Sequence, residues 1–306
     1  MKRLQNKISE SRLTLPITFV LATGVWVLAG LFQEQWWIQL GCFALSAFLM
    51  VELNNNNALI RIHSRMVSCS FIMLTCAACF LFSSLRESIA ELFVIAAYVV
   101  LFTTYQDKDS PGLTFYGFLL LGLACISYIH LIILIPILWG LMLTNLQSLS
   151  WRTFLASLIG ILTPYWLLLC WEVYQDDYTL LTPHVTALGD IHIPFQFSVL
   201  SPHLSITFVY IAILAILGIL HFWKTSYQDK FRIRQLYGFF IRMDLALFLL
   251  FCLQPQHGTI LLRLIIINTA PLIAHFTALT QERVTNIIFC VILISVILLT
   301  AYNLWM

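Results

Sequence analysis

Charge is what this sequence has least of. Only 10% of its 306 residues are Asp, Glu, Lys or Arg, whereas 60% are hydrophobic and 14% are aromatic. Soluble domains carry about 25% charged residues, so this chain has too few to cover a water-facing surface. Lipid is therefore the expected solvent for most of the chain. The formal net charge of +2 is too small to favour a nucleic-acid partner.

The motifs of several enzyme classes are also missing. The chain has no G-x-x-x-x-G-K-[ST], no G-x-S-x-G and no H-E-x-x-H sequence. Cys76 and Cys79 match the C-x-x-C spacing of redox and metal sites, but they have no second pair and no flanking cation. We interpret them as small residues packed between membrane helices, and we expect no cofactor and no metal.

Long apolar runs divide the chain. Lys2, Arg3, Lys7 and Arg12 precede the run at 13–32, which is too long for a signal peptide and has no cleavage site after it. We expect it to be a retained first span, since a transmembrane helix needs about 20 apolar residues. Further runs of similar character cover residues 36–51, 66–83, 89–104, 154–174, 205–223, 236–253, 259–279 and 285–303.

The run at 114–145 is too long for one upright helix. If it forms two short spans that turn near 127–130, every Lys and Arg except Arg86 and Arg263 lies on one side. Cytoplasmic loops collect Lys and Arg, so this division is favoured over a single span. The sequence thus predicts an all-α polytopic transmembrane bundle, a single domain over 1–306, with about eleven spans including this short-helix pair. The N-terminus is in the cytoplasm and the C-terminus is outside.

The most polar segment, VELNNNNALIRIHSRM at 51–66, falls between the second and third spans. Asparagine tolerates turn conformations and caps helix ends, so the four asparagines predict a cytoplasmic hairpin. Arg61 and Arg65 would anchor that hairpin on the inner face. A binding role for the asparagines is the alternative reading.

The segment at 175–204 is predicted to be the longest periplasmic loop. It has no Lys or Arg and carries three aspartates and three histidines: Asp176, Asp177, Asp190, His184, His192 and His203. His and Asp together suit a metal ion, but their irregular spacing favours a solvated loop.

Arg263 lies about five residues into the tenth span, where an unpaired arginine is costly unless it reaches the headgroups or finds a partner. Glu91 and Asp244 are the available acids. A cavity that holds Arg263 and an acid could bind a phosphate or a carboxylate. Arg263, Glu91, Asp177 and His130 are therefore the candidate substrate-binding residues. Insertion of Arg263 among the outer headgroups is the alternative.

The segment KTSYQDKFRIRQLYGFFIR at 224–242 is both basic and aromatic. Such a composition is typical of an inner-surface anchor to anionic lipid. A loop that docks a protein partner is an equally good interpretation.

Two stretches carry a resemblance to a known family. LTFYGFLLLGLACISYIHLIILIPILWGL and LSWRTFLASLIGILTPYWLLLCWEVY are similar to a family of uncharacterised multi-pass inner-membrane proteins of Bacteroidota. The resembling pattern places two glycine-bearing helices, an aromatic turn and a tryptophan-arginine pair at Gly122, Tyr128, Trp139, Trp151, Arg152, Gly160 and Pro164. This resemblance implies a bacterial inner-membrane location and no particular activity.

A more distant similarity is to GT-C-type glycosyltransferases, which use polyprenyl-phosphate sugar donors at the outer face. In this reading Glu34 or Asp176 would be the catalytic base, and Arg263 would hold the donor phosphate. That class has a long first outer loop, which this chain replaces with Gln33, Glu34 and Gln35.

Three functions are therefore carried forward. The first is a non-enzymatic membrane component of cell-envelope biogenesis. The second is a GT-C-like transferase acting on a polyprenyl-linked glycan, and the third is a transporter or flippase. The expected partners are membrane lipid, other envelope membrane proteins and, for the transferase, a polyprenyl-phosphate-linked glycan.

Overall fold

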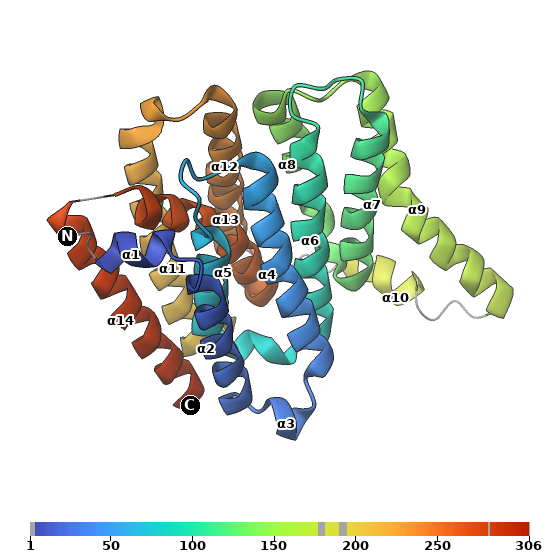
Figure 1. The fold of residues 1–306 in the computed structure, drawn as a ribbon. Coiled ribbons are helices and arrows are strands. Elements are labelled where there is room, and N and C mark those ends of the chain that lie inside the picture. The colour runs from blue at the N-terminus through green and yellow to red at the C-terminus, as the bar shows by residue number, and fades with distance from the viewer. Residues whose placement is uncertain (1–3, 177–180, 190–194, 281, 306) are drawn as a thin grey trace. The chain divides into compact units, whose positions relative to one another are not determined.

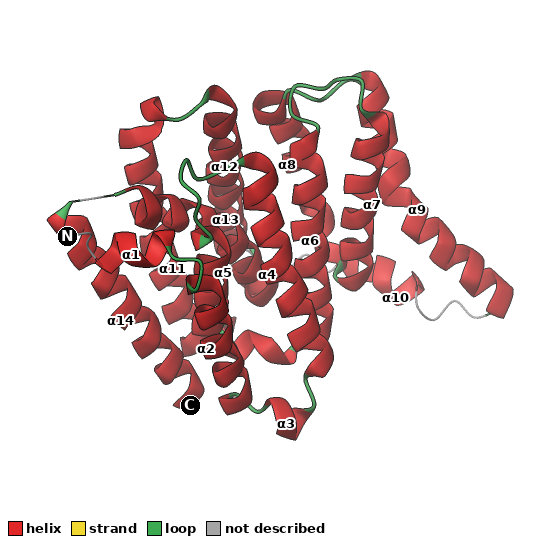
Figure 2. Ribbon diagram, viewed as in Figure 1, coloured by secondary structure: helices red, strands yellow, loops and turns green. Residues whose placement is uncertain are grey.

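The computed structural model describes residues 4–176, 181–189, 195–280 and 282–305. Every regular element in these ranges is a helix (Figure 2), which confirms the all-α prediction. The chain divides into two compact units. Unit 1 contains Met1–Leu85 and Phe195–Met306, and unit 2 contains Arg86–Pro194.

Unit 1 is built around one buried helix, α13 (Gly258–Leu279), of whose most apolar stretch 94% is buried. Helices α5, α11 and α12 pack against it (Figure 1). The other elements of unit 1 are α1 (Leu4–Glu10), α2 (Thr14–Leu28), α3 (Leu31–Glu34), α4 (Trp37–Asn57), α5 (Met66–Ala77), η1 (Cys79–Ser83), η5 (Phe197–Val199), α11 (Pro202–Thr225), η6 (Ser226–Gln228), α12 (Phe231–Leu253), η7 (Pro255–His257) and α14 (Arg283–Trp305).

Polar side chains inside unit 1 are satisfied by neighbouring helices. Thr269 Oγ1 of α13 donates to Asp244 Oδ2 of α12 at 2.9 Å. Asn303 Nδ2 of α14 donates to the carbonyl oxygen of Ala77 at 2.6 Å, and its Oδ1 lies 2.9 Å from His203 Nδ1. Such bonds stabilise a bundle in lipid, where polar groups have no water to replace them.

Unit 2 contains α6 (Leu85–Thr103), α7 (Pro111–Ser127), η2 (Ile129–Ile133), α8 (Leu134–Leu141), the π-helical η3 (Met142–Leu146), α9 (Trp151–Gln175), α10 (Leu181–Thr186) and η4 (Ala187–Gly189). Helices α7 and α9 lie side by side (Figure 1). Two glycines permit this contact. A Cβ atom at Gly160 would lie 2.6 Å from the carbonyl oxygen of Phe115, and one at Gly122 would lie 2.8 Å from that of Ile161.

Seven helices in the described ranges are long and apolar enough to cross a membrane, or eight if the bent pair α1 and α2 is one span. The chain is therefore a multi-pass membrane protein whose helices contact lipid. Each of the ten apolar runs contains helix, and the run at 114–145 does break, at Tyr128. Eleven crossings remain a prediction, because α5 and α7 are shorter than a full span. The direction of the N-terminus also remains a prediction, because helix length and composition do not give it.

The sequence predicted that the four asparagines at 54–57 would lie in a hairpin loop. In the structure they form the last turn of α4 instead. Asn57 Nδ2 donates to the carbonyl oxygen of Leu53 at 2.9 Å, and Asn54 Nδ2 donates to that of Ser64 at 3.0 Å. The asparagine side chains thus bind carbonyl groups at the end of the helix and in the loop that follows. The chain leaves the helix at Ala58, which has a positive φ of 47°.

Candidate functional site

A buried aspartate joins two loops of unit 1 that are far apart in the sequence. Asp229 lies between α11 and α12, and its side chain is fully buried. Its Oδ1 atom is 3.0 Å from Arg61 Nε, in the loop after α4, and its Oδ2 atom is 3.1 Å from His275 Nε2 of α13. We call Arg61, Asp229 and His275 the ion lock. It fixes both loops to the central helix.

Two further hydrogen bonds connect the same loops. Arg61 Nη1 donates to Gln228 Oε1 at 2.9 Å, and Arg232 Nη2 donates to Asn57 Oδ1 at 2.9 Å. These bonds explain why Asn57 has to lie at the very end of α4. The guanidinium groups of Arg61 and Arg232 are therefore oriented by hydrogen bonds, unlike that of a flexible surface arginine.

The exposed cations that these loops carry form a surface that we call the basic platform. It consists of six cations, Arg61, Arg65, Lys224, Lys230, Arg232 and Arg234, and of the exposed side chain of His63. Asp229 is the one acid within 53–65 and 224–234, and it is buried. Asp229 offsets the charge of Arg61, and the other cations of these two segments have no exposed carboxylate within the segments themselves.

The inner end of the ion lock is lined with aromatic rings. His275 is fully buried, and its ring centroid lies 4.9 Å from that of Tyr237, 5.4 Å from that of Phe222 and 5.5 Å from that of His221. In such surroundings, burying a carboxylate without partners would cost several kcal/mol. Asp229 is stabilised only because a histidine and an arginine both reach it.

Three large aromatic side chains next to the platform are exposed. They are Trp223 at 63%, Tyr227 at 75% and Phe231 at 50%. All three lie where α11 ends and α12 begins. Tryptophan and tyrosine collect at the headgroup level of membranes, because one end of each ring system is apolar and the other is polar. The platform is therefore suited to the boundary between lipid and water.

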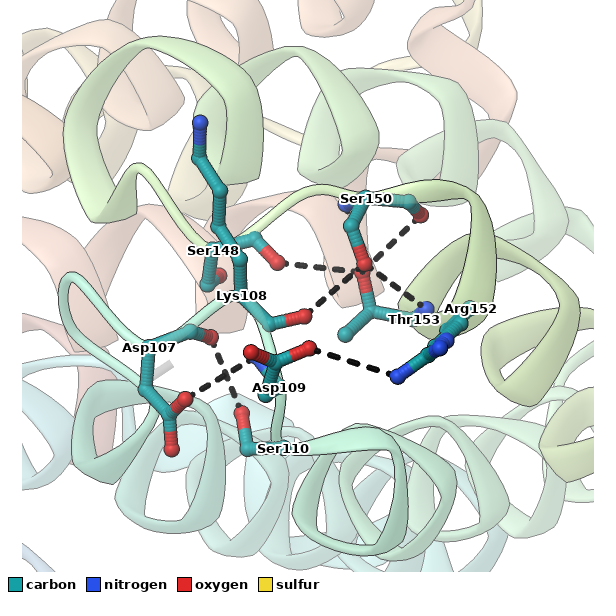
Figure 3. Close-up of polar contacts among 8 residues, drawn as sticks. All are labelled: Asp107, Lys108, Asp109, Ser110, Ser148, Ser150, Arg152 and Thr153. Atoms are coloured by element: carbon teal, nitrogen blue, oxygen red, sulfur yellow. Dashed lines mark hydrogen bonds and ion pairs between the residues drawn. The ribbon is translucent and has the colours of Figure 1, made fainter.

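Unit 2 also joins two loops, at 104–110 and 147–150, but it does so differently (Figure 3). The backbone N–H of Gln106 donates to the carbonyl oxygen of Leu146 at 2.8 Å. Ser150 Oγ donates to the carbonyl oxygen of Lys108 at 2.9 Å, and the same hydroxyl accepts from the N–H of Thr153 to cap α9. We call these two segments the unit 2 loop pair.

The charged side chains of the unit 2 loop pair contribute little to it. Arg152 Nη1 and Asp109 Oδ1 are 3.6 Å apart, and both side chains are largely exposed, at 78% and 85%. A pair this long and this hydrated adds between 0 and about 1 kcal/mol. The loops border an open hollow of about 770 Å³ that Asp107, Lys108 and Gln147 help to line. Its charged lining is two aspartates, Asp107 and Asp109, and one lysine, Lys108, so the hollow does not favour an anionic ligand.

Two of the residues that the sequence singled out for a site lie in unit 1. Glu34 ends α3 and is exposed. Arg263 is 3% exposed and donates from Nη2 to the carbonyl oxygen of Leu81 in η1. Its guanidinium is thus bound to the backbone inside unit 1.

The other predicted site residues belong to unit 2. Asp176 is exposed at the end of α9, and Glu91 is buried on α6. His130 is half-buried, with its ring centroid 5.6 Å from that of Tyr128. Burial, together with the charge of Glu87, raises the pKa of Tyr128 to about 12. Asp177 lies outside the described residues.

The histidines of the segment after α9 do not form a metal centre in the part of the chain that the structure describes. His184 Nε2 lies 3.4 Å from the hydroxyl oxygen of Tyr165, and burial lowers the pKa of His184. His203 contacts Asn303 on α14. His192 and Asp190 lie outside the described residues.

The sequence did not identify Asp229 or His275 as site residues. The signals were present: Asp229 is the one acid in the basic segment 224–234, and His275 is a lone histidine in an apolar helix. Neither feature shows which residue the side chain contacts, because Asp229 and His275 are 46 positions apart in the chain. Only the fold brings them together.

No protein-family model, no curated protein and no solved structure matches this chain.

Proposed function

We propose that the protein is a non-enzymatic multi-pass component of a bacterial inner membrane. It serves cell-envelope biogenesis by binding the anionic headgroups of membrane lipids on its basic platform. The observation that carries this proposal is the ion lock, in which a fully buried Asp229 holds Arg61 and His275. The resemblance to inner-membrane proteins of Bacteroidota supports the location.

The electrostatics of the platform support an anionic partner. A Lys or Arg close to a membrane surface adds about 1 kcal/mol of attraction to anionic lipid. The platform has six such residues, and its exposed aromatic flank of Trp223, Tyr227 and Phe231 is suited to the headgroup layer. In this proposal the platform faces the cytoplasm, where the positive-inside rule places cations.

The ion lock gives the platform its specificity. An unstructured polybasic segment binds anionic membranes through charge alone. Here the buried carboxylate of Asp229, with its arginine and histidine partners, fixes the relative positions of two loops, and a preorganised surface loses less conformational entropy on binding. We therefore infer that the platform recognises an arrangement of phosphate groups as well as their charge.

Lipid retention tests the proposal. Purified protein in nanodiscs of mixed anionic and zwitterionic phospholipid is extracted, and the lipids that stay bound are identified by mass spectrometry. The double variant Lys224→Gln/Lys230→Gln is expected to reduce the preference for anionic lipid about thirtyfold, given about 1 kcal/mol for each of the two cations.

The matched control for this test is Lys108→Gln/Arg152→Gln, which removes two exposed cations from the unit 2 loop pair. It is expected to leave the anionic preference within about twofold of the parent. Equal losses from both double variants would show that net charge, and not the platform, selects the lipid.

A second experiment separates this function from the transferase alternative. Glu34 and Asp176 are both exposed, so Glu34→Gln and Asp176→Asn are expected to leave folding intact. Each variant is returned to a deletion strain of the native host, and surface glycan length is measured. Unchanged glycans at normal expression agree with a non-enzymatic component. Shortened glycans would favour a GT-C-like transferase.

A further inference from the structure

Unit 1 contains an apolar groove of about 750 Å³ that the basic platform does not use. Helices α2, α5 and α14 form its sides, and none of its lining residues is charged. Ile17 and Leu21 of α2 and Ile297 of α14 are exposed along its rim, at 55%, 61% and 63%. Ile72 and Val296 are buried in its floor, at 1% and 4%. The groove therefore opens to the surroundings of these helices.

We propose that this groove binds an acyl chain of an anionic glycerophospholipid. The helices around it contact lipid, so the groove is filled from the membrane and not from water. Its volume falls within the range of about 300–1,000 Å³ that is usual for small-molecule sites. The proposal rests on the multi-pass membrane character of the chain and is independent of the platform.

The N-terminal helix α1 closes one end of the groove. It meets α2 at 94° and so runs across the start of α2, where its Ile8 lines the groove. Gln5 fixes it there, because its Nε2 atom donates to the carbonyl oxygen of Thr277 at 2.7 Å and its backbone N–H donates to Asn286 Oδ1 at 3.1 Å. Helix α1 is thereby held between the C-terminal end of α13 and the start of α14.

The segments that form this closed end carry exposed cations. Ile8 and Thr14 line the groove, and the exposed Lys7 and Arg12 are their near neighbours in the sequence. Arg283 is exposed at the start of α14, the helix that Gln5 contacts.

The exposed acids of the same segments are Glu10 and Glu282, so the three cations outnumber the two acids. This end of the groove is complementary to a phosphate, while its uncharged lining is complementary to a hydrocarbon chain. Together the two features select a lipid that has both.

The test fills the groove and, separately, removes its cations. Leu21→Trp/Ile297→Trp places two large rings on the groove rim. Val20→Trp/Ile294→Trp is the matched control, because these exposed residues lie on the same helices but do not line the groove. Each protein is purified with its native lipids, and the bound species are counted and identified by native mass spectrometry.

The groove-filling variant is expected to lose one bound phospholipid per chain, whereas the control retains it. Lys7→Gln/Arg12→Gln is expected to keep a lipid bound but to lower the preference for anionic over zwitterionic headgroups at least about fivefold. The platform variant Lys224→Gln/Lys230→Gln is expected to retain the groove lipid, so failure of one proposal is distinguishable from failure of the other.

Three outcomes would overturn the groove proposal. The filled and control variants could retain the same number of lipids, which would mean that the groove is not the site. The retained molecule could be an isoprenoid phosphate without glycerol, so that the occupant is a different lipid. A dimer that the groove-filling variant abolishes would show that a second copy of the chain fills the groove.

Discussion

In unit 1 the loops after α4 and α11 are joined through charged side chains, whereas in unit 2 the loops after α6 and η3 are joined through backbone groups and hydroxyls. The acid that matters in unit 1, Asp229, is fully buried between Arg61 and His275. The acid at the equivalent point of unit 2, Asp109, is 85% exposed and 3.6 Å from its arginine.

The two units therefore differ in what their loop contacts fix. The contacts of the unit 2 loop pair fix the backbone alone, whereas those of unit 1 also fix charged side chains. Hydroxyl and backbone bonds close the unit 2 loop pair at little desolvation cost, and they fix no charge in space. The ion lock is costly, because the carboxylate of Asp229 and the imidazole of His275 are fully buried and lose water, while the side chain of Arg61 stays 32% exposed. In return it fixes the cations of the platform, and this is why we place the function there.

The largest expected effect comes from breaking the ion lock. Asp229→Ala leaves Arg61 and His275 without their common partner, and we expect it to lower the free energy of unfolding by about 3–5 kcal/mol. Asp109→Ala is the matched change in unit 2, with an expected loss below about 1 kcal/mol. Thermal unfolding in detergent, followed by tryptophan fluorescence, measures both. Similar losses for the two variants would contradict the comparison.

A smaller effect is expected from the contact between α7 and α9. In Gly160→Ala the new methyl group would meet the carbonyl oxygen of Phe115 at 2.6 Å, so the helices must separate. We expect a loss of about 1–3 kcal/mol, as for other overpacked sites.

Gly140→Ala is the control for this change, because no atom lies within 4 Å of its added Cβ. It should be neutral or stabilising by up to about 1 kcal/mol, since alanine is a better helix former than glycine. The same unfolding assay checks both variants. A destabilised Gly140→Ala protein would mean that the space beside Gly140 is occupied, contrary to the packing described for unit 2.

The smallest effect is expected at Ser150. Ser150→Ala removes a helix cap and the bond to the carbonyl oxygen of Lys108, which together should cost about 1–2 kcal/mol. Ser205→Ala, whose hydroxyl bonds only within its own helix, should change stability by less than about 0.5 kcal/mol. Hydrogen exchange at residues 106–110 should increase in the first variant alone. Unchanged exchange there would show that the Ser150 hydroxyl does not join the two loops.

The helices were largely predictable from the sequence. An apolar run in lipid forms a helix, because its backbone groups have no water to bond, and the run at 114–145 breaks within the turn predicted at 127–130. The end of α4 was not predictable. The asparagines at 54–57 continue the helix only because Asn57 meets Arg232 and Asn54 meets Ser64, and these contacts arise from the fold.

The candidate site was predictable only in part. The basic and aromatic character of 224–242 was evident, and it remains the basis of the platform. The contribution of Arg61 was read as simple anchoring, because its ion pair with Asp229 joins residues that are 168 positions apart. Long-range pairs of this kind leave no local pattern, so neither spacing nor composition reveals them.

One measurement tests the central claim most directly: the anionic-lipid preference of Asp229→Asn in mixed nanodiscs. This change removes a negative charge, so attraction by net charge alone would strengthen the preference. Our account predicts a weaker preference, about fivefold lower or more, because the loops of the platform are no longer held in register. A folded Asp229→Asn protein that binds anionic lipid as well as the parent or better would contradict the account.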